Sequence, residues 1–290
     1  MTLLDFVNFH LAPGIVLGAI YALGAIGITL VFGVMRYAHL AHGDMATFGA
    51  FMVLGAMRLL GLTPWQALPI AMVGTALLAV AIDRAFYAHL RRQPMILTVI
   101  ASLGVALMLR SVVQVFYGVD TQLYVRGLVR PDVYFGIRLR DREILTVVVA
   151  IGLVVALTLF LGRSRWGKAM RAMADNPDLA RLSGIDTRFV VALTWLIVGG
   201  LAAAAGFLLG LNTEVRSMMG WNMLLPMFAA AILGGVGRVD GALIGGLIVG
   251  IVEETSVLFL PAQYKSAMAF VILLAMLALR PTGIMRGKVL

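Results

Sequence analysis

The chain has 290 residues, of which 61% are hydrophobic and 13% are charged, and its formal net charge is +9. Soluble domains carry roughly 25% charged residues, so this composition indicates a polytopic membrane protein and excludes a separate soluble catalytic domain. The lack of cysteine excludes disulfides, thiol catalysis and thiolate metal sites, and basic residues in loops between apolar stretches are typical of membrane orientation and lipid contact, not of nucleic-acid binding.

A membrane-spanning helix needs roughly 20 apolar residues, and a re-entrant one fewer. About eight to nine membrane segments are therefore predicted, in an all-α helical bundle that forms a single transmembrane domain over residues 1–290. The first segment has no basic region before it and exceeds the length of a signal peptide, so no cleavage is expected. The predicted segments are 11–35, 44–60, 64–86, 94–117, 144–162, 189–211, 222–236, 241–260 and 264–279.

Lys and Arg residues predict the orientation of the bundle. If the N-terminus lies outside, more of them fall in inner loops than in outer ones, and the tail before Arg36 has none. Because positive charge is retained on the cytoplasmic side, the N-terminus is expected outside and the C-terminus inside. Residues 118–142, which are rich in arginine, are the exception to this pattern.

Two glycine-rich breaks interrupt the apolar segments. The first, 33–43, contains Arg36, His39 and His42, with Asp44 just beyond it, and the second, 234–241, contains Arg238 and Asp240. In transporters such interruptions mark the translocation pathway. Alternatively, they are tight inner turns that contact a cytoplasmic partner or lock the bundle through Arg–Asp pairs. An internal duplication of the chain stays open.

Few ionisable residues lie within the predicted spans. Arg110 must face the bundle interior or pair, since an arginine in lipid costs several kcal/mol; it is expected either to pair with a glutamate or to line a polar cavity for a zwitterionic substrate. His39 and His42 have no third ligand nearby, so no metal site is expected. The candidate translocation residues are Arg36, His39, His42, Asp44, Arg110, Arg238, Asp240 and Glu253.

The predicted outer loop 118–142 is too long for a simple connector. Its alternating VYFGIRLR stretch indicates a hairpin or plug. We expect a soluble partner protein to dock there through Arg126, Arg130 and Arg138. The alternative is a solvated loop whose charges have no partner.

The predicted inner loop 163–188 is expected to form two short helices. Met170 and Met173 fall on one face of the first helix, opposite its charged residues. Asn176 before Pro177 is a typical N-cap for the second helix, and Gly184 is a typical stop signal. A capped helix pair with exposed Met and Leu side chains is typical of a surface that a partner grips.

The sequence of this loop resembles a known family. The pattern G-K-A-M-R-A-x-A-x-N-P-x-x-A-x-x-x-G-I, residues 167–185, is similar to the cytoplasmic coupling loop of ABC importer permeases of the branched-chain amino acid (LivH-type) family. Residues 14–51 and 232–250 resemble two further signatures of that family. The resemblance implies that the ATPase-coupling residues are Gly167, Arg171, Ala172, Asn176, Pro177, Ala180, Gly184 and Ile185.

The resemblance also implies the partners and the location: cytoplasmic ABC ATPase subunits, a second related permease, a periplasmic binding protein and the lipid of a bacterial inner membrane. Branched-chain or other hydrophobic amino acids are the expected cargo, with urea or short amides as an alternative. No nucleotide-binding or catalytic motif occurs in the sequence, so no catalytic residue and no cofactor are expected. An ion-coupled secondary transporter that uses Glu253, Glu254, Arg110 and the histidines is the competing hypothesis, and an integral membrane enzyme is a weaker one.

Overall fold

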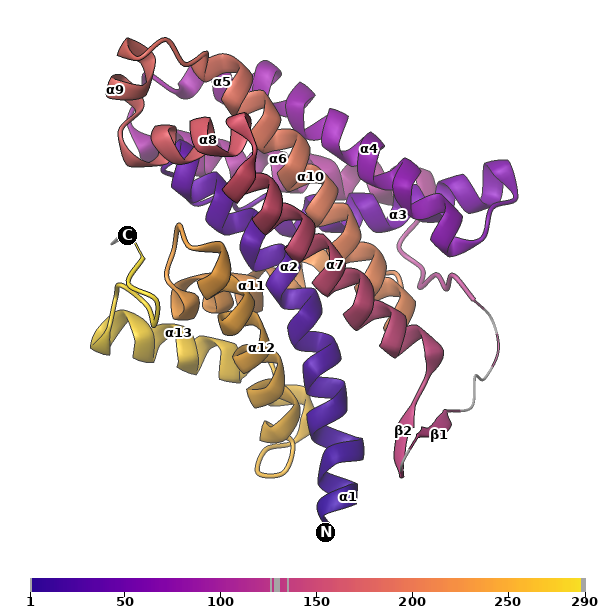
Figure 1. Ribbon diagram of the computed structural model, residues 1–290. Coiled ribbons are helices and arrows are strands. Elements are labelled where there is room, and N and C mark those ends of the chain that lie inside the picture. The colour runs from indigo at the N-terminus through magenta and orange to yellow at the C-terminus, as the bar shows by residue number, and fades with distance from the viewer. Residues whose placement is uncertain (1, 126, 128–130, 135, 288–290) are drawn as a thin grey trace.

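The computed structural model is almost entirely helical and describes residues 2–125, 127, 131–134 and 136–287 (Figure 1). Two π-helical turns, η1 (Val7–Leu11) and η2 (Asp83–Tyr87), and a 3-10 turn, η3 (Ala262–Tyr264), adjoin α-helices, and the strands β1 (Asp132–Tyr134) and β2 (Ile137–Leu139) pair antiparallel. The α-helices are α1 (Leu3–Phe6), α2 (Ala12–Met35), α3 (His42–Leu60), α4 (Pro64–Ile82), α5 (Ala88–Leu90), α6 (Met95–Tyr117), α7 (Asp141–Arg163), α8 (Arg165–Asp175), α9 (Pro177–Leu182), α10 (Thr187–Asn212), α11 (Met219–Gly234), α12 (Val239–Ser256) and α13 (Ala267–Leu279).

The helices confirm the predicted class of fold. Among the described residues, 7 helical segments are long and apolar enough to cross a membrane. The first begins at Leu3 instead of residue 11, and the third continues through η2 to Leu90 instead of ending at residue 86. The predicted segments 222–236 and 241–260 correspond to α11, which has only 16 residues, and to α12, which contains Asp240, Glu253 and Glu254. The number of membrane crossings beyond these 7 stays a prediction.

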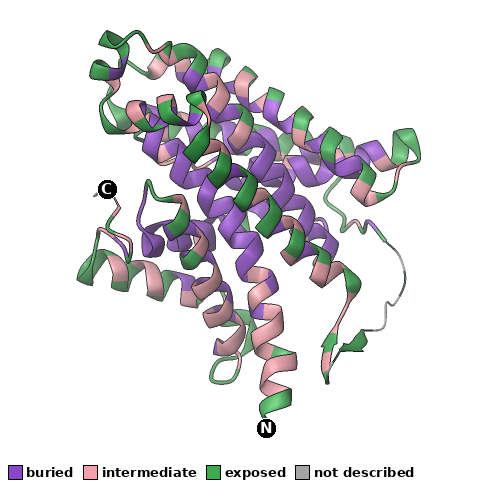
Figure 2. Ribbon diagram, viewed as in Figure 1, coloured by how far each residue is buried: buried purple, intermediate pink, exposed green. Residues whose placement is uncertain are grey.

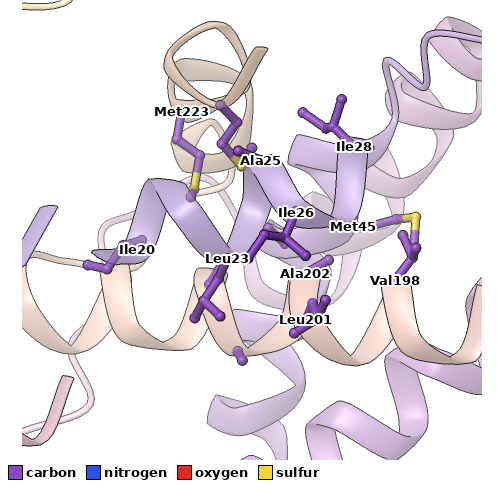
Figure 3. Close-up of a cluster of buried hydrophobic side chains, with 14 of the residues drawn as sticks. Ile20, Leu23, Ala25, Ile26, Ile28, Met45, Val198, Leu201, Ala202 and Met223 are labelled. Carbon is purple, nitrogen blue, oxygen red and sulfur yellow. The ribbon is translucent and has the colours of Figure 1, made fainter. Parts of the chain in front are cut away.

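Helix α2 lies at the centre of the bundle. It packs against α10, α12, α11 and α3, and its Ile20, Leu23 and Ile26 belong to a buried cluster that also contains Val198 and Leu201 of α10 (Figure 3). Burial is greatest along α2 and α10, whereas α13 and the outward face of α7 are largely exposed (Figure 2). Exposed apolar faces on the outer helices suit contact with lipid.

Small residues let α2 and α12 approach each other closely. A Cβ atom added to Gly14 would lie 2.8 Å from the Cα atom of Ile251, and one added to Gly18 would lie 2.8 Å from the Cα atom of Leu247. In lipid, close backbone approach supplies the packing energy that hydrophobic burial supplies in water. Gly14 and Gly18 therefore belong to a helix-packing surface.

The loops gather at two opposite ends of the bundle (Figure 1). At one end, Arg36 donates a hydrogen bond to the backbone oxygen of Asp175 (3.2 Å), and Gly33 lies beside Gly237. At the other end lie the N-terminus and the β-hairpin, and residues 122 and 215 form an isolated backbone bridge. The loops that the sequence assigns to one side thus share one end, while the N-out, C-in orientation stays a prediction.

Candidate functional site

The helix pair α8–α9 folds because both helices are capped by side chains. Ser164 Oγ accepts a hydrogen bond from the Gly167 N–H at 2.8 Å, and Asn176 Oδ1 accepts two, from the N–H groups of residues 178 and 179, at 3.1 Å. Pro177 occupies the first turn of α9, where its missing N–H costs nothing. Gly184 follows with φ +82°, a left-handed conformation that favours glycine. The predicted pair of short helices is confirmed.

The apolar face of α8 is turned toward the bundle. Met170 and Met173 are buried, which corrects the expectation that methionines are exposed here. Arg171 donates a hydrogen bond to the backbone oxygen of Leu161 at the end of α7. A Cβ atom on Gly167 would collide with the backbone of Leu161. These contacts attach α8 firmly to α7, α2 and α10.

The remaining predicted coupling residues lie on the side of the helix pair that packs against the bundle, and the exposed side is formed by leucines that the prediction did not include. Ala180 is buried, and Ala172 and Ile185 are half-buried against the apolar cluster. Leu179 and Leu182 of α9, by contrast, are 60% and 84% exposed. This end of the bundle therefore presents an exposed apolar ridge on a rigidly attached base.

The second glycine-rich break lies next to α8. Arg238 and Asp240 line a cavity of about 270 Å³ together with Arg171 of α8 and Thr29 and Gly33 of α2. Within the described residues neither break pairs its own arginine with its own acid: Arg36 bonds a backbone oxygen, and Arg238 and Asp240 form no ion pair with each other. The first break thus contacts the end of α8 directly, and the second shares a cavity with it.

Arg110 pairs with Asp44 and not with a glutamate, which corrects that expectation. The Arg110 Nε–Asp44 Oδ1 distance is 2.9 Å and the Nη2–Oδ2 distance is 3.0 Å. The guanidinium also lies 5.0 Å from the ring centroid of Trp221 in α11. Asp44 is fully buried, so this bidentate pair satisfies a carboxylate that would otherwise be costly to bury and joins α3, α6 and α11.

The two histidines are fully buried in a cluster of aromatic rings. The His39 Nε2 atom lies 3.0 Å from the Tyr87 hydroxyl oxygen, and the His39 ring lies edge-on to Trp195 with the centroids 4.9 Å apart. His42 packs against Gly27 of α2. No group of three metal-ligating side chains occurs among the described residues. Within the described structure these histidines belong to the packed contacts between the loop after α2, η2 and α10.

Glu253 lies toward the opposite end of α2. Its Oε2 atom accepts a hydrogen bond of 2.8 Å from the Tyr21 hydroxyl, while the neighbouring Glu254 pairs with Lys265. The candidate translocation residues thus fall into separate places: the Asp44–Arg110 pair, the histidine cluster, the cavity beside α8, and Glu253. The structure does not join them into one continuous polar path through the residues that it describes.

The predicted hairpin is confirmed and rests on the N-terminal helix. The Arg138 N–H donates a hydrogen bond of 2.7 Å to Asn8 Oδ1, and Asn8 Nδ2 donates one of 3.2 Å to the Gly136 oxygen. The Arg138 side chain is exposed. Arg126 and Arg130 lie outside the described residues.

Comparison with known proteins identifies the family to which this chain belongs. A family profile described as "Branched-chain amino acid transport system / permease component" matches residues 11–277. The chain belongs to this family. Members are permease components of ABC importers, so the protein is a multi-pass membrane transport subunit and not itself an enzyme.

Individual relatives match the permease over nearly its whole length. It is 32% identical to the high-affinity branched-chain amino acid transport system permease protein LivH of Salmonella typhimurium, over 94% of this chain and 93% of the relative. It is also 32% identical to BraD, of the same description, from Pseudomonas aeruginosa, over 95% and 94%. PsaBC from Streptococcus pneumoniae, solved in complex with a Fab, shares the fold with a TM-score of 0.52 at 14% identity, over 96% of this chain and 95% of that one.

Sequence reasoning missed several residues that build the α8–α9 end of the permease. Tyr37, Tyr87 and Trp195 surround His39, and both carboxylate oxygens of Asp83 lie 2.5 Å from Arg91 Nη2. Aromatic residues near helix ends suggest lipid headgroup contact as readily as burial, so the sequence pattern had no signal that could assign these rings to the interior.

Proposed function

We propose that this permease moves branched-chain or other hydrophobic amino acids across the bacterial inner membrane, driven by separate cytoplasmic ATPase subunits that dock on α9. The observation that carries the proposal is the exposed ridge of Leu179 and Leu182 on a capped helix pair whose other face is buried in the bundle. The relatives named for branched-chain amino acid transport, which match nearly the whole chain, support the cargo.

The contacts of α8 suggest how work would reach the membrane segments. An ATPase dimer that closes on ATP would displace α9, and α8 would follow. Because α8 is held by buried Met170 and Met173 and by the Arg171 contact to α7, its displacement would tilt α7, α2 and α10. Different contacts of α9 with the two states of the ATPase are required for such a coupling.

The remaining partners follow the same proposal. A second related permease would complete the translocation pathway. Asp44, Arg110 and the residues of the two glycine-rich breaks would lie near that pathway. A periplasmic binding protein would deliver cargo at the hairpin end through Arg126, Arg130 and Arg138. Urea and short amides stay alternative cargoes, because the binding protein would select the substrate.

Uptake by the reconstituted complex tests this function. The permease is placed in proteoliposomes with partner ATPases, a second permease and a binding protein, and uptake of labelled leucine and of labelled urea is measured with and without ATP. We expect ATP-dependent uptake of leucine. Accumulation of solute by the permease alone on a proton or sodium gradient would refute the proposal in favour of a secondary transporter.

A variant pair tests the docking surface in the same vesicles. Leu179→Ala with Leu182→Ala should reduce ATP-dependent uptake at least tenfold, the effect of losing roughly 1.4 kcal/mol of contact energy. Leu3→Ala, at the opposite end of the bundle and 81% exposed, should leave uptake unchanged. Equal uptake by both variants would contradict the docking of an ATPase on α9.

A further inference from the structure

A basic cavity lies at the α8–α9 end of the bundle, apart from the exposed ridge. Its volume is about 740 Å³, and it lies between the loop after α2, the turn after α5, and the segment from α9 to the start of α10. Five arginines line it, Arg36, Arg91, Arg92, Arg181 and Arg188, against two acids, Asp83 and Asp178. The wall of the cavity is therefore strongly positive.

Much of this positive charge has no counterpart within the protein. Arg91 is paired with Asp83, at 2.5 Å, and Arg36 is directed to a backbone oxygen. The side chains of Arg92, Arg181 and Arg188 make no hydrogen bond or ion pair with the residues that the structure describes. Three unpaired guanidinium groups, from two segments that are far apart in the chain, thus border one cavity.

A buried hydroxyl provides a second, independent sign of a ligand. Tyr37 lines the cavity and is 5% exposed, yet its hydroxyl has no hydrogen-bond partner among the described residues. Burial raises the pKa of Tyr37 well above its usual value, so the hydroxyl keeps its proton and is a donor. A buried donor without a partner costs free energy, and an anion bound in the cavity would supply the missing acceptor.

From these groups we infer that the cavity binds a phosphate-bearing anion, held by Arg92, Arg181, Arg188 and the Tyr37 hydroxyl. Arginine binds phosphate oxygens through paired N–H groups, and basic pockets on the cytoplasmic side of transmembrane helices bind acidic lipid headgroups. Two sources share this chemistry: an acidic phospholipid of the inner leaflet and free phosphate.

The neighbouring helices favour the lipid as the source. Met95, at the start of α6, both lines the cavity and is 58% exposed. The exposed residues that follow it, Ile96 and Ile100, continue an apolar face along α6. A lipid with its phosphate in the cavity can therefore place its acyl chains along α6, as free phosphate cannot.

Binding to the purified full-length permease tests the inference. The affinity is measured in detergent, by native mass spectrometry, for phosphatidylglycerol and for phosphatidylcholine with the same acyl chains, and in a separate arm with inorganic phosphate as the competitor. We expect phosphatidylglycerol to bind at least tenfold more tightly than phosphatidylcholine. Displacement of it by millimolar phosphate would also support the site and would identify the free anion as a ligand. Equal affinity for both lipids, with no effect of phosphate, would overturn it.

Variants locate the site. Arg92→Gln with Arg188→Gln should weaken phosphatidylglycerol binding about 30-fold, the effect of removing two arginines near an anionic lipid, and Tyr37→Phe should weaken it several-fold while keeping the ring. Arg165→Gln is the matched control, because Arg165 lies in the loop 163–188 with Arg188 but does not line the cavity. This variant should bind phosphatidylglycerol normally. If the double variant binds lipid like the control but no longer retains the ATPases, the cavity receives a protein partner and the inference fails.

Discussion

At the scale of single residues, the Asp44–Arg110 pair is the most consequential interaction within the membrane segments. Removing one partner of a buried pair leaves an uncompensated charge and costs about 3 kcal/mol or more. Asp44→Asn should therefore lower the thermal unfolding midpoint of the permease in detergent markedly, and the double change Asp44→Asn with Arg110→Gln should recover part of the loss.

The exposed pair between Arg216 and Glu214, 2.5 Å apart, provides the control for this prediction. Because water screens such a pair, Glu214→Gln should cost less than about 1 kcal/mol. Equal losses for Asp44→Asn and Glu214→Gln would contradict a structural role for the buried pair.

The sequence could predict this residue-scale chemistry only in part. It shows that Arg110 needs a partner, since an arginine cannot face lipid cheaply, but Asp44 is 66 positions away and no periodicity relates the two. For the same reason nothing in the sequence brings together the cavity arginines, which come from segments distant in the chain.

At the scale of helices, the glycine contacts determine how closely the central elements pack. A Cβ atom at Gly206 of α10 would lie 2.6 Å from the backbone carbonyl carbon of Ala46 in α3, whereas one at Gly152 of α7 would meet nothing within 4 Å. Gly206→Ala should thus cost roughly 1–3 kcal/mol through overpacking, and Gly152→Ala should cause no loss. Thermal unfolding of the two variants in detergent measures the difference, and equal midpoints would contradict the close approach of α3 and α10.

Local signals made the elements themselves predictable. Asn176 before Pro177 and Gly184 marked the two ends of α9 correctly, because caps and stops depend on neighbouring residues alone. The direction of the apolar face of α8 was not predictable in this way. Met170 and Met173 define a face, but only the packed structure shows that this face meets the bundle.

At the scale of the whole molecule, the N-out, C-in orientation can be tested directly because the chain has no cysteine. Val133→Cys in the exposed hairpin should react with a membrane-impermeant maleimide in cells whose outer membrane alone has been opened. Leu182→Cys on α9 should react only after the inner membrane is permeabilised, and Ala25→Cys, buried in the core, should react in neither case. If Leu182→Cys reacts while the inner membrane is intact and Val133→Cys does not, the orientation is the opposite of the one predicted.

One continuous run of helix, Leu3–Met35, spans 33 residues, or about 50 Å at 1.5 Å per residue. Near its first tip Asn8 bonds the hairpin, and just beyond its last turn Arg36 bonds the end of α8. In the proposed complex, a binding protein at one end and an ATPase at the other would therefore act on the same continuous helix. Docking of a loaded binding protein would then be transmitted across the membrane as a change in the tilt of this one helix.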